Sequence, residues 1–331
     1  MDQMARLRGS RVISTSLGRA QFAAEYCAQQ PTATVVCWFL DVHLAQLAQA
    51  ANSHLTNLQV LCESDLPAAE YDLAALPLSM QGNAELTREL LQETYTRLCL
   101  GGQLIAATDN PQDHWLHAEL QKFFEKVTRI HDARGMIYLA TKTKPLKRRK
   151  SYGCVFSFRD GERDLQVMSR PGVFSHRRLD QGARALIDQM VIQPDEAVFE
   201  IGCGSGAVTV AAATRASGVQ VDAIDSNPRA VECTLQSAAL NGVSNITATL
   251  TATGLSPQPG SYHVALANPP YYSQDRLTEI FVQGALQALQ PQGRLYLVTK
   301  HAAWYETHLP QLFRQVQCIP ARGYLIFACQ R

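Results

Sequence analysis

The chain has 331 residues, of which 46% are hydrophobic, and carries a net charge of +1. This length and composition are enough for two domains, each with its own core. The sequence has no run of 18 apolar residues, no apolar signal-peptide core, and nine cysteines without a CxxC pair or a metal-site spacing, so we expect a cytoplasmic protein with reduced thiols, no membrane span and no bound metal.

The first half alternates segments that look like strands with segments that look like helices. The strand-like segments include VVCWFLD, which ends at Asp41, NLQVLC, which starts at Asn57, and YDLAALPL, which starts at Tyr71. Strands that alternate with helices indicate an open, largely parallel sheet, which we expect over residues 1–141.

The positive charge is concentrated in the middle of the chain. Residues 142–180 carry 11 basic and 4 acidic side chains, whereas residues 1–141 carry 10 and 15 and residues 181–331 carry 9 and 10. The densest stretch, KTKPLKRRK, contains Lys147, Arg148, Arg149 and Lys150. This stretch is either a solvated linker or a surface for the phosphates of a nucleic acid, and the sequence leaves both interpretations open. A β-hairpin that turns at Asp160-Gly161 is expected after it.

The second half begins with a short apolar strand, Ala197–Ile201, and a glycine-rich turn. The turn contains Gly202, Gly204 and Gly206, and a helix rich in Ala and Val follows. Glycines let the backbone turn tightly and approach a ligand closely. A second strand ends at Asp225, where a carboxylate can accept hydrogen bonds from both hydroxyls of a ribose.

The rest of the second half continues the alternation. A helix follows with Asn227 as its N-cap, Pro228 in its first turn and Asn241-Gly242 as its stop. Further strands are predicted at NITATL, YHVALA, RLYLVT and ARGYLIFACQ, and a helix is predicted at RLTEIFVQGALQALQPQG. This pattern predicts a second parallel sheet.

The glycine turn alone suits several nucleotide cofactors. Glu200 at its entrance would repel a pyrophosphate, and no third glycine stands at the spacing of a dinucleotide site. A carboxylate there suits a ligand with an ammonium group, and S-adenosylmethionine has an α-amino group and no phosphate. The turn therefore favours a methyl donor over NAD.

The fourth strand of this half ends in Asn268-Pro269-Pro270-Tyr271. In isolation such a sequence would only end a strand, but here it follows a glycine turn and an acidic strand end. An exocyclic amine of a nucleobase is a poor nucleophile, because its lone pair is delocalised into the ring. The amide oxygen of Asn268 and the carbonyl of Pro269 can draw the amine hydrogens out of the ring plane. Tyr271 can stack on the flat substrate, and positioning then supplies most of the rate.

Residues 171–331 resemble class I S-adenosylmethionine-dependent methyltransferases of the Asn-Pro-Pro-Tyr type, and most of all the RsmC/RlmG family of ribosomal RNA guanine-N2 methyltransferases. Besides the glycine turn and LANPPYY, the resemblance rests on GVFSHRRLDQGARALI before the turn. It implies donor contacts from residues of five segments: Phe174, Asp180, Gly182, Glu200, Gly202, Cys203, Gly204, Gly206, Asp225, Ser226, Thr253 and Asn268.

The resemblance also implies that Asn268, Pro269, Pro270 and Tyr271 hold the target base. The partner it implies is ribosomal RNA or a ribosomal subunit particle. The chain departs from the family at Tyr272, where His is common, and at Thr253, where Asp or Asn is common.

The first half is similar to the second. The segment from Tyr71 aligns with the segment from Tyr262 at a constant offset of 191, and NLQVLC aligns with NITATL at an offset of 188. VISTSLGRAQFAAEY aligns with VFEIGCGSGAVTVAA, and the strand that ends at Asp41 aligns with the one that ends at Asp225. These matches predict a tandem duplication.

The first copy lacks the residues of the site. Ser14, Ser16 and Ala20 stand at the positions of Glu200, Gly202 and Gly206, and Pro77-Leu78 stands at the position of Asn268-Pro269. We therefore predict an α/β protein of two tandem Rossmann-like methyltransferase domains, each with a mostly parallel sheet. Residues 1–141 form a degenerate domain without a donor site, residues 142–170 a basic linker and β-hairpin, and residues 171–331 the catalytic domain of a monomer.

Three functions remain in competition. The first is methylation of the exocyclic N2 amine of a guanine in ribosomal RNA, with the small subunit favoured over the large one. The second keeps the donor but modifies adenine N6 in a nucleic acid or the side-chain amide of a protein glutamine. The third is a non-catalytic RNA-binding or assembly factor, which the intact glycine turn, Asp225 and Asn268 argue against.

Overall fold

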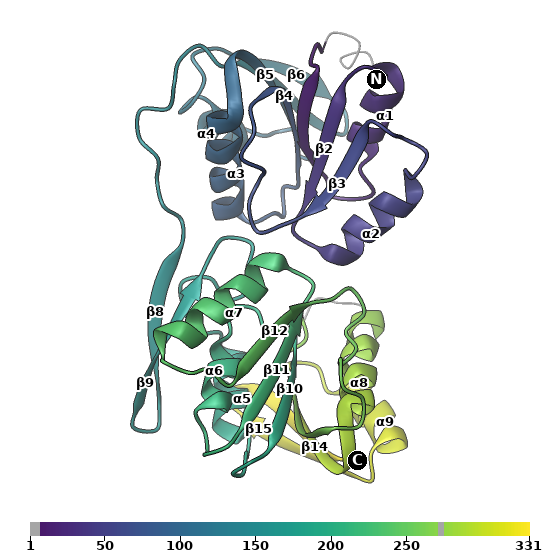
Figure 1. The fold of residues 1–331 in the computed structure, drawn as a ribbon, viewed down its shortest axis with the longest axis vertical. Helices are drawn as coiled ribbons and strands as arrows, with labels where there is room; N and C mark the ends of the chain where they lie inside the picture. The colour runs from purple at the N-terminus through teal and green to yellow at the C-terminus, as the bar shows by residue number, and fades with distance from the viewer. Residues whose placement is uncertain (1–6, 271–274) are drawn as a thin grey trace. The chain divides into compact units, whose positions relative to one another are not determined.

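The computed structural model describes residues 7–270 and 275–331, so Tyr271 and Tyr272 lie outside the described residues (Figure 1). The chain divides into two compact units, Met1–Tyr152 and Gly153–Arg331. The division falls inside the segment expected as a linker, so the basic stretch belongs to the first unit and the hairpin to the second. Over the described ranges, no helix has the length and apolar character needed to cross a membrane.

The first unit consists of seven strands and four helices over its described residues. In chain order these are β1 (Arg11–Thr15), α1 (Gln21–Gln29), β2 (Thr34–Phe39), α2 (Val42–Ala51), β3 (Leu58–Cys62), β4 (Tyr71–Leu78), α3 (Ala84–Arg97), β5 (Leu98–Thr108), α4 (Trp115–Leu120), β6 (Val127–Asp132) and β7 (Gly135–Thr141).

The second unit opens with the predicted hairpin, in which Asp160 pairs with Arg163 across the turn. A second set of alternating strands and helices follows. In chain order the elements are β8 (Cys154–Asp160), β9 (Arg163–Ser169), α5 (Gln181–Gln189), β10 (Ala197–Ile201), α6 (Ala207–Ala213), β11 (Gln220–Asp225), α7 (Pro228–Leu240), β12 (Ile246–Leu250), β13 (Tyr262–Ala267), α8 (Asp275–Ala288), β14 (Leu289–Thr299), α9 (Ala303–Leu312), β15 (Gln315–Ala321) and β16 (Tyr324–Gln330).

The two large sheets have the same strand order. The first runs β3-β2-β1-β4-β5-β7-β6 and the second runs β12-β11-β10-β13-β14-β16-β15. In each order the first five strands are parallel to one another. The sixth strand, β7 or β16, is antiparallel to both of its neighbours. The predicted tandem of two Rossmann-like sheets is confirmed. The elements α9 and β15 were not predicted from the sequence; α9 contains Pro310, and no side chain of β15 is fully buried.

Helices cover both faces of each sheet (Figure 1). In the first unit, α1 and α2 bury alanines on one face, while α3 and α4 pack leucines and aromatic side chains on the other. In the second unit, α5 and α6 pack on one face and α8 and α9 on the other. Because both faces are covered, the central strands β1 and β10 are buried along most of their length rather than on alternate residues.

The sheet registers correct one of the predicted correspondences. The strands β1 and β2 and the helix α2 each begin 186 positions before β10, β11 and α7. This offset places Phe39 at the position of Asp225, and Asp41 at the position of Asn227. Asp41 is the N-cap of α2, and its side chain accepts a hydrogen bond from the backbone N–H of Leu44 at 2.9 Å. The predicted match of Asp41 with Asp225 is therefore wrong, because strand pairing and not the nearest acidic residue fixes the register.

Candidate active site

The candidate site lies at the carboxyl ends of three neighbouring strands of the second sheet. Ile201 of β10 pairs with Ile224 of β11 on one side and with Ala267 of β13 on the other. The glycine turn, Asp225 and Asn268 follow directly after these paired positions. They therefore emerge at one edge of the sheet, which is where open parallel α/β sheets bind ligands.

The glycine turn has a backbone and surroundings that require glycine. Gly202, Gly204 and Gly206 have φ angles of 75°, 55° and 81°. A Cβ on Gly202 would lie 3.0 Å from Cζ of Phe281, and a Cβ on Gly206 would lie 2.8 Å from Cα of Thr234. Larger residues would both strain the backbone and crowd the neighbouring helices.

Asp225 connects the second strand to the glycine turn. Its Oδ2 accepts a hydrogen bond from the backbone N–H of Gly204 at 2.9 Å, and its Oδ1 accepts one from the N–H of Asn227 at 2.9 Å. A carboxylate offers about four lone-pair sites and can accept from several donors at once, ribose hydroxyls among them. Asp225 thus orders the turn as well as being a candidate ligand.

Glu200 is a buried carboxyl group beneath the turn. The hydroxyl of Thr209 donates a hydrogen bond to its Oε2. Burial is the main cause that raises the pKa of Glu200 to about 8; the hydrogen bond from Thr209 acts to lower the pKa, and the charge of Asp225 acts to raise it. The carboxyl is therefore mainly protonated at pH 7 in this setting, and a cationic group brought beside it would favour the carboxylate.

The segment that precedes α5 lies against the turn. A Cβ on Gly204 would lie 3.6 Å from Cβ of Phe174, whose side chain is 49% exposed. The start of α7 holds this segment, because Nδ2 of Asn227 donates to the carbonyl of Gly172 at 2.8 Å and the buried Arg229 donates to the carbonyl of Pro171 at 2.8 Å. An apolar ring is thus fixed beside the glycine turn.

Asn268 is oriented by the N-cap of α5. Its Nδ2 donates a long hydrogen bond of 3.4 Å to Oδ2 of Asp180, which also accepts from the backbone N–H of Ala183 at 2.9 Å. With the amide nitrogen held in this way, Oδ1 is the end of the amide that can accept a hydrogen bond from a substrate. Pro269 is buried and Pro270 is exposed.

The remaining residues expected to contact the methyl donor differ in burial and in their distance along the chain from the glycine turn. Cys203 is buried in the turn, and burial, then the charges of Asp225 and Glu200, raise the pKa of its thiol, so it is a poor nucleophile. Gly182 is buried in the first turn of α5, and Ser226 lies between Asp225 and the N-cap of α7. Thr253 is exposed, and its hydroxyl lies 3.1 Å from that of Thr251.

The basic stretch packs in part on the first unit. Nε of Arg149 donates to Oε1 of Glu93 in α3 at 2.9 Å, and the backbone N–H of Lys150 donates to Oε1 of Gln92 at 2.8 Å. Lys147 and Arg148 are exposed. The four side chains expected to bind RNA therefore differ in their contacts with the protein: Arg149 forms an ion pair with Glu93, which ties it to α3.

Three supporting residues were not indicated by the sequence pattern. Thr209 holds the carboxyl of Glu200, Phe281 limits the space at Gly202, and Arg229 fixes the segment before α5. The sequence offered one signal for these three residues: a charged residue, Arg229, on the face of α7 that otherwise carries small residues. In the structure Arg229 is 1% exposed.

The equivalent edge of the first unit carries different side chains. The hydroxyl of Ser16 accepts hydrogen bonds from the backbone N–H groups of Gly18 and Ala20, both at 3.1 Å, and so takes up donors of its own loop. Ser14 is buried at the position of Glu200, and Phe39 is buried at the position of Asp225. No described side chain of this loop offers the carboxylates found in the second unit.

Residues 164–328 match the family model of the methyltransferase small domain. The ribosomal RNA small subunit methyltransferase C of Pseudoalteromonas atlantica is 27% identical over 304 residues, which are 88% of this chain and 87% of that protein. The protein of the same name from Pseudomonas aeruginosa is 33% identical over 158 residues, which are 45% of this chain and 46% of that protein.

A solved structure of a ribosomal RNA methyltransferase is similar over the whole chain. It is the 16S rRNA N2 G1207 methyltransferase of T. thermophilus in complex with AdoMet and guanosine, and it covers 100% of this chain and 91% of its own, with a TM-score of 0.78 and 18% identity. At this identity the likeness establishes that the two proteins share their two-unit fold.

Proposed function

We propose that this chain, which belongs to the ribosomal RNA small subunit methyltransferase C family, transfers a methyl group from S-adenosylmethionine to the exocyclic N2 amine of a guanine in small-subunit ribosomal RNA. The observation that carries the proposal is the amide of Asn268, held by Asp180 at a strand end next to the glycine turn. This arrangement presents a neutral acceptor to a planar amine.

The side chains at the edge of the second sheet suit S-adenosylmethionine. They combine a glycine cradle that a Cβ would fill with two acidic groups, Glu200 and Asp225, and an apolar ring, Phe174. Asp225 can accept hydrogen bonds from ribose hydroxyls and would repel a pyrophosphate, and the carboxyl of Glu200 would ionise beside an ammonium group. When bound, S-adenosylmethionine supplies a methyl group on a sulfonium, which is the electrophile of the reaction.

The role of the chain in the reaction is to orient the target amine. Oδ1 of Asn268 and the carbonyl of Pro269 accept the two amine hydrogens, so the nitrogen lone pair no longer conjugates fully with the base ring. Asp180 keeps the amide in the required orientation. No strong base is needed, because the positively charged product amine loses its proton readily, and positioning supplies most of the rate.

The test is methyl transfer from a labelled donor to unmodified ribosomal RNA and to partly assembled subunits, followed by mapping of the modified base. The expected product is N2-methylguanine at one position of the small-subunit RNA. Label on adenine N6, on protein, or on no component would contradict the proposal.

We further propose that the protein is a monomer and is located in the cytoplasm. We also propose that the exposed side chains of Lys147 and Arg148 contact RNA phosphates. Changing both residues to Glu should weaken RNA binding, and the loss should grow at low salt, where phosphate contacts contribute most. Arg149→Glu is the contrast, because it breaks the ion pair with Glu93 and should lower the thermal stability of the first unit instead. Unchanged affinity in the double variant would contradict this role.

A further inference from the structure

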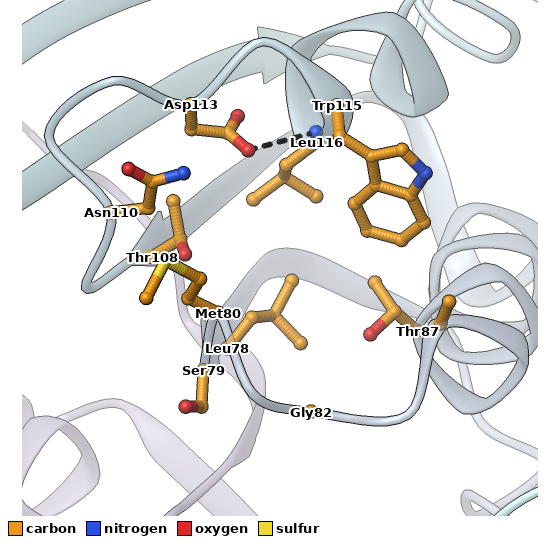
Figure 2. A pocket seen from close by; sticks show the side chains of 11 residues that line it. Leu78, Ser79, Met80, Gly82, Thr87, Thr108, Asn110, Asp113, Trp115 and Leu116 are labelled. Atoms are coloured by element: carbon orange, nitrogen blue, oxygen red, sulfur yellow. Dashed lines mark hydrogen bonds between the residues drawn. The ribbon is translucent and has the colours of Figure 1, made fainter.

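The first unit contains a cavity of about 180 Å³ at the carboxyl edge of its sheet (Figure 2). Its walls come from the end of β4 and the turn after it, the start of α3, the end of β5 and the start of α4. The cavity is smaller than the ~300–1,000 Å³ typical of drug-sized ligands, so it suits a single small ring system.

This cavity occupies the place that the target base is proposed to take in the second unit. The constant offset of 191 between β4 and β13, and between α3 and α8, places Leu78 and Ser79 of the wall at the positions of Pro269 and Pro270. Thr87 of the wall stands at the position of Thr278. The first unit has therefore kept the acceptor side of the edge while its donor side has closed.

An aromatic ring stands at the mouth of the cavity. Trp115 is 40% exposed, and Figure 2 shows its indole ring along one wall. The guanidinium of Arg88 lies 5.3 Å from the ring centroid and is itself paired with Glu119 at 3.0 Å, which restrains the ring. Met80, which stands at the position of Tyr271, is 61% exposed at the opposite wall. A flat ring can be held between an indole and a thioether.

The polar groups of the cavity suit the edge of a nucleobase. Oδ1 of Asn110 accepts from the backbone N–H of Gln112 at 3.0 Å, which turns Nδ2 of Asn110 toward the cavity (Figure 2). The carboxylate of Asp113 lies on the same side. Its Oδ2 accepts from the hydroxyl of Tyr138 at 2.6 Å and from the N–H of His117 at 3.3 Å, and its Oδ1 accepts from the N–H of Leu116 at 3.2 Å, so its orientation is fixed. A carboxylate disfavours anions, whereas a base edge carries neutral donors and acceptors next to each other.

We propose that this cavity binds a second, unpaired nucleobase of the RNA substrate, which it holds without modifying it. This inference rests on the proposed function, since it takes the substrate to be RNA. The first unit would then position the RNA so that the target guanine is presented to the second unit, and it would contribute to the choice of site. The cavity needs no donor site for this purpose, and its own strand end, Pro77-Leu78, offers no side-chain amide.

The first experiment compares Trp115→Ala with the control Leu100→Ala, which removes an exposed apolar side chain of the same unit away from the cavity. Binding of an unmodified fragment of small-subunit RNA should weaken by roughly 5- to 150-fold in Trp115→Ala, as for the loss of one base stack, and stay unchanged in Leu100→Ala. KM for RNA should rise while KM for the methyl donor and kcat at saturating RNA stay near the wild-type values. Trp115→Phe should restore most of the affinity, because Phe still stacks.

The second experiment observes the cavity directly in the full chain labelled with 5-fluorotryptophan. The fluorine resonance of Trp115 should move on addition of the RNA fragment, or of nucleoside 5′-monophosphates at millimolar concentration, whereas that of the buried Trp38 should not. Asn110→Ala should reduce the effect.

An unmoved Trp115 resonance in the presence of bound RNA would overturn the inference, as would equal RNA affinity of Trp115→Ala and Leu100→Ala. A Trp115→Ala variant that loses only thermal stability would do the same. These outcomes are separate from the failure of the proposed function, which would appear as absence of methyl transfer by the wild-type protein. The nucleotide-dependent shift of Trp115 can still be measured in that case.

Discussion

The two units share a strand order and a register but differ in a few side chains at one edge of the sheet. Both sheets place their first parallel strand in the middle and close with an antiparallel pair. The first unit forms the same sheet with Ser14, Phe39 and Pro77 at the positions of Glu200, Asp225 and Asn268. The fold therefore does not require these residues, and their presence in the second unit calls for a chemical explanation.

The difference also shows what a site costs the fold. In the second unit a carboxyl group is fully buried with a pKa of about 8, which means that its ionised form is strongly disfavoured there. In the first unit the same position holds Ser14, which has no charge to bury. The loop of the first unit instead satisfies its own backbone through the hydroxyl of Ser16.

The largest expected effect concerns the amide that distinguishes the two strand ends. Asn268→Ala should lower methyl transfer on the order of 100-fold or more, because the amine then has one acceptor and is misplaced. KM for the donor should change little. Pro77→Asn, made in the first unit of that variant, should restore no activity, because the donor side of that unit is closed. Full activity of Asn268→Ala in the labelled-donor assay would contradict the acceptor role.

A second contrast concerns the sizes of two facing residues, one in the glycine turn and one in the helix that packs on it. Gly206 in the second unit faces Thr234, whereas at the same positions the first unit has Ala20 and Ala48. Gly206→Ala should destabilise the second unit by about 2–4 kcal/mol through left-handed strain and crowding, as measured by denaturant unfolding. The double variant Gly206→Ala/Thr234→Ala should recover part of this loss. Absence of any recovery would show that crowding against Thr234 is not the cause.

A third contrast concerns pH. The folded-state pKa of Glu200, about 8, lies above the ordinary value of 4.5, so the native state binds a proton more tightly than the unfolded state. The stabilisation from this proton is complete below about pH 4.5 and is lost as the pH rises to about 8. Glu200→Gln should flatten this decline in a series of melting temperatures from pH 5 to pH 8. Exposed Glu162→Gln is the control that should keep the wild-type slope, and an unaltered slope in Glu200→Gln would reject this assignment.

The smallest expected effect is a stabilisation of the first unit. Ala20 has a φ of 62°, the left-handed conformation that Gly206 adopts in the second unit. Ala20→Gly should raise the unfolding free energy by about 1 kcal/mol or less, since it removes strain but adds unfolded-state entropy. Ala23→Gly, inside α1, should have the opposite sign. Equal signs for the two variants in thermal unfolding would show that Ala20 is not strained.

Much of the fold could be predicted from the sequence because its signals are local. Apolar runs, the glycine turn, the Asn227-Pro228 cap and the internal alignment led to two parallel sheets in tandem, and the structure confirms them. The match of Asp41 with Asp225 was wrong because an acidic residue near a strand end is equally suited to cap the next helix. Helix α9 and strand β15 were missed because Pro310 in α9 usually ends a helix, and because no side chain of β15 is fully buried.

The sequence by itself determined the residue types of the candidate site and the order in which strands deliver them. Only the tertiary structure decided which of them touch: Asp180 holds Asn268 across 88 positions of the chain, and Thr209 shares the buried space of Glu200. It alone also revealed the cavity beside Trp115. Local patterns report conformation and polarity, whereas contacts between distant segments, burial and the pKa values that follow from burial depend on how the sheet and its helices pack together.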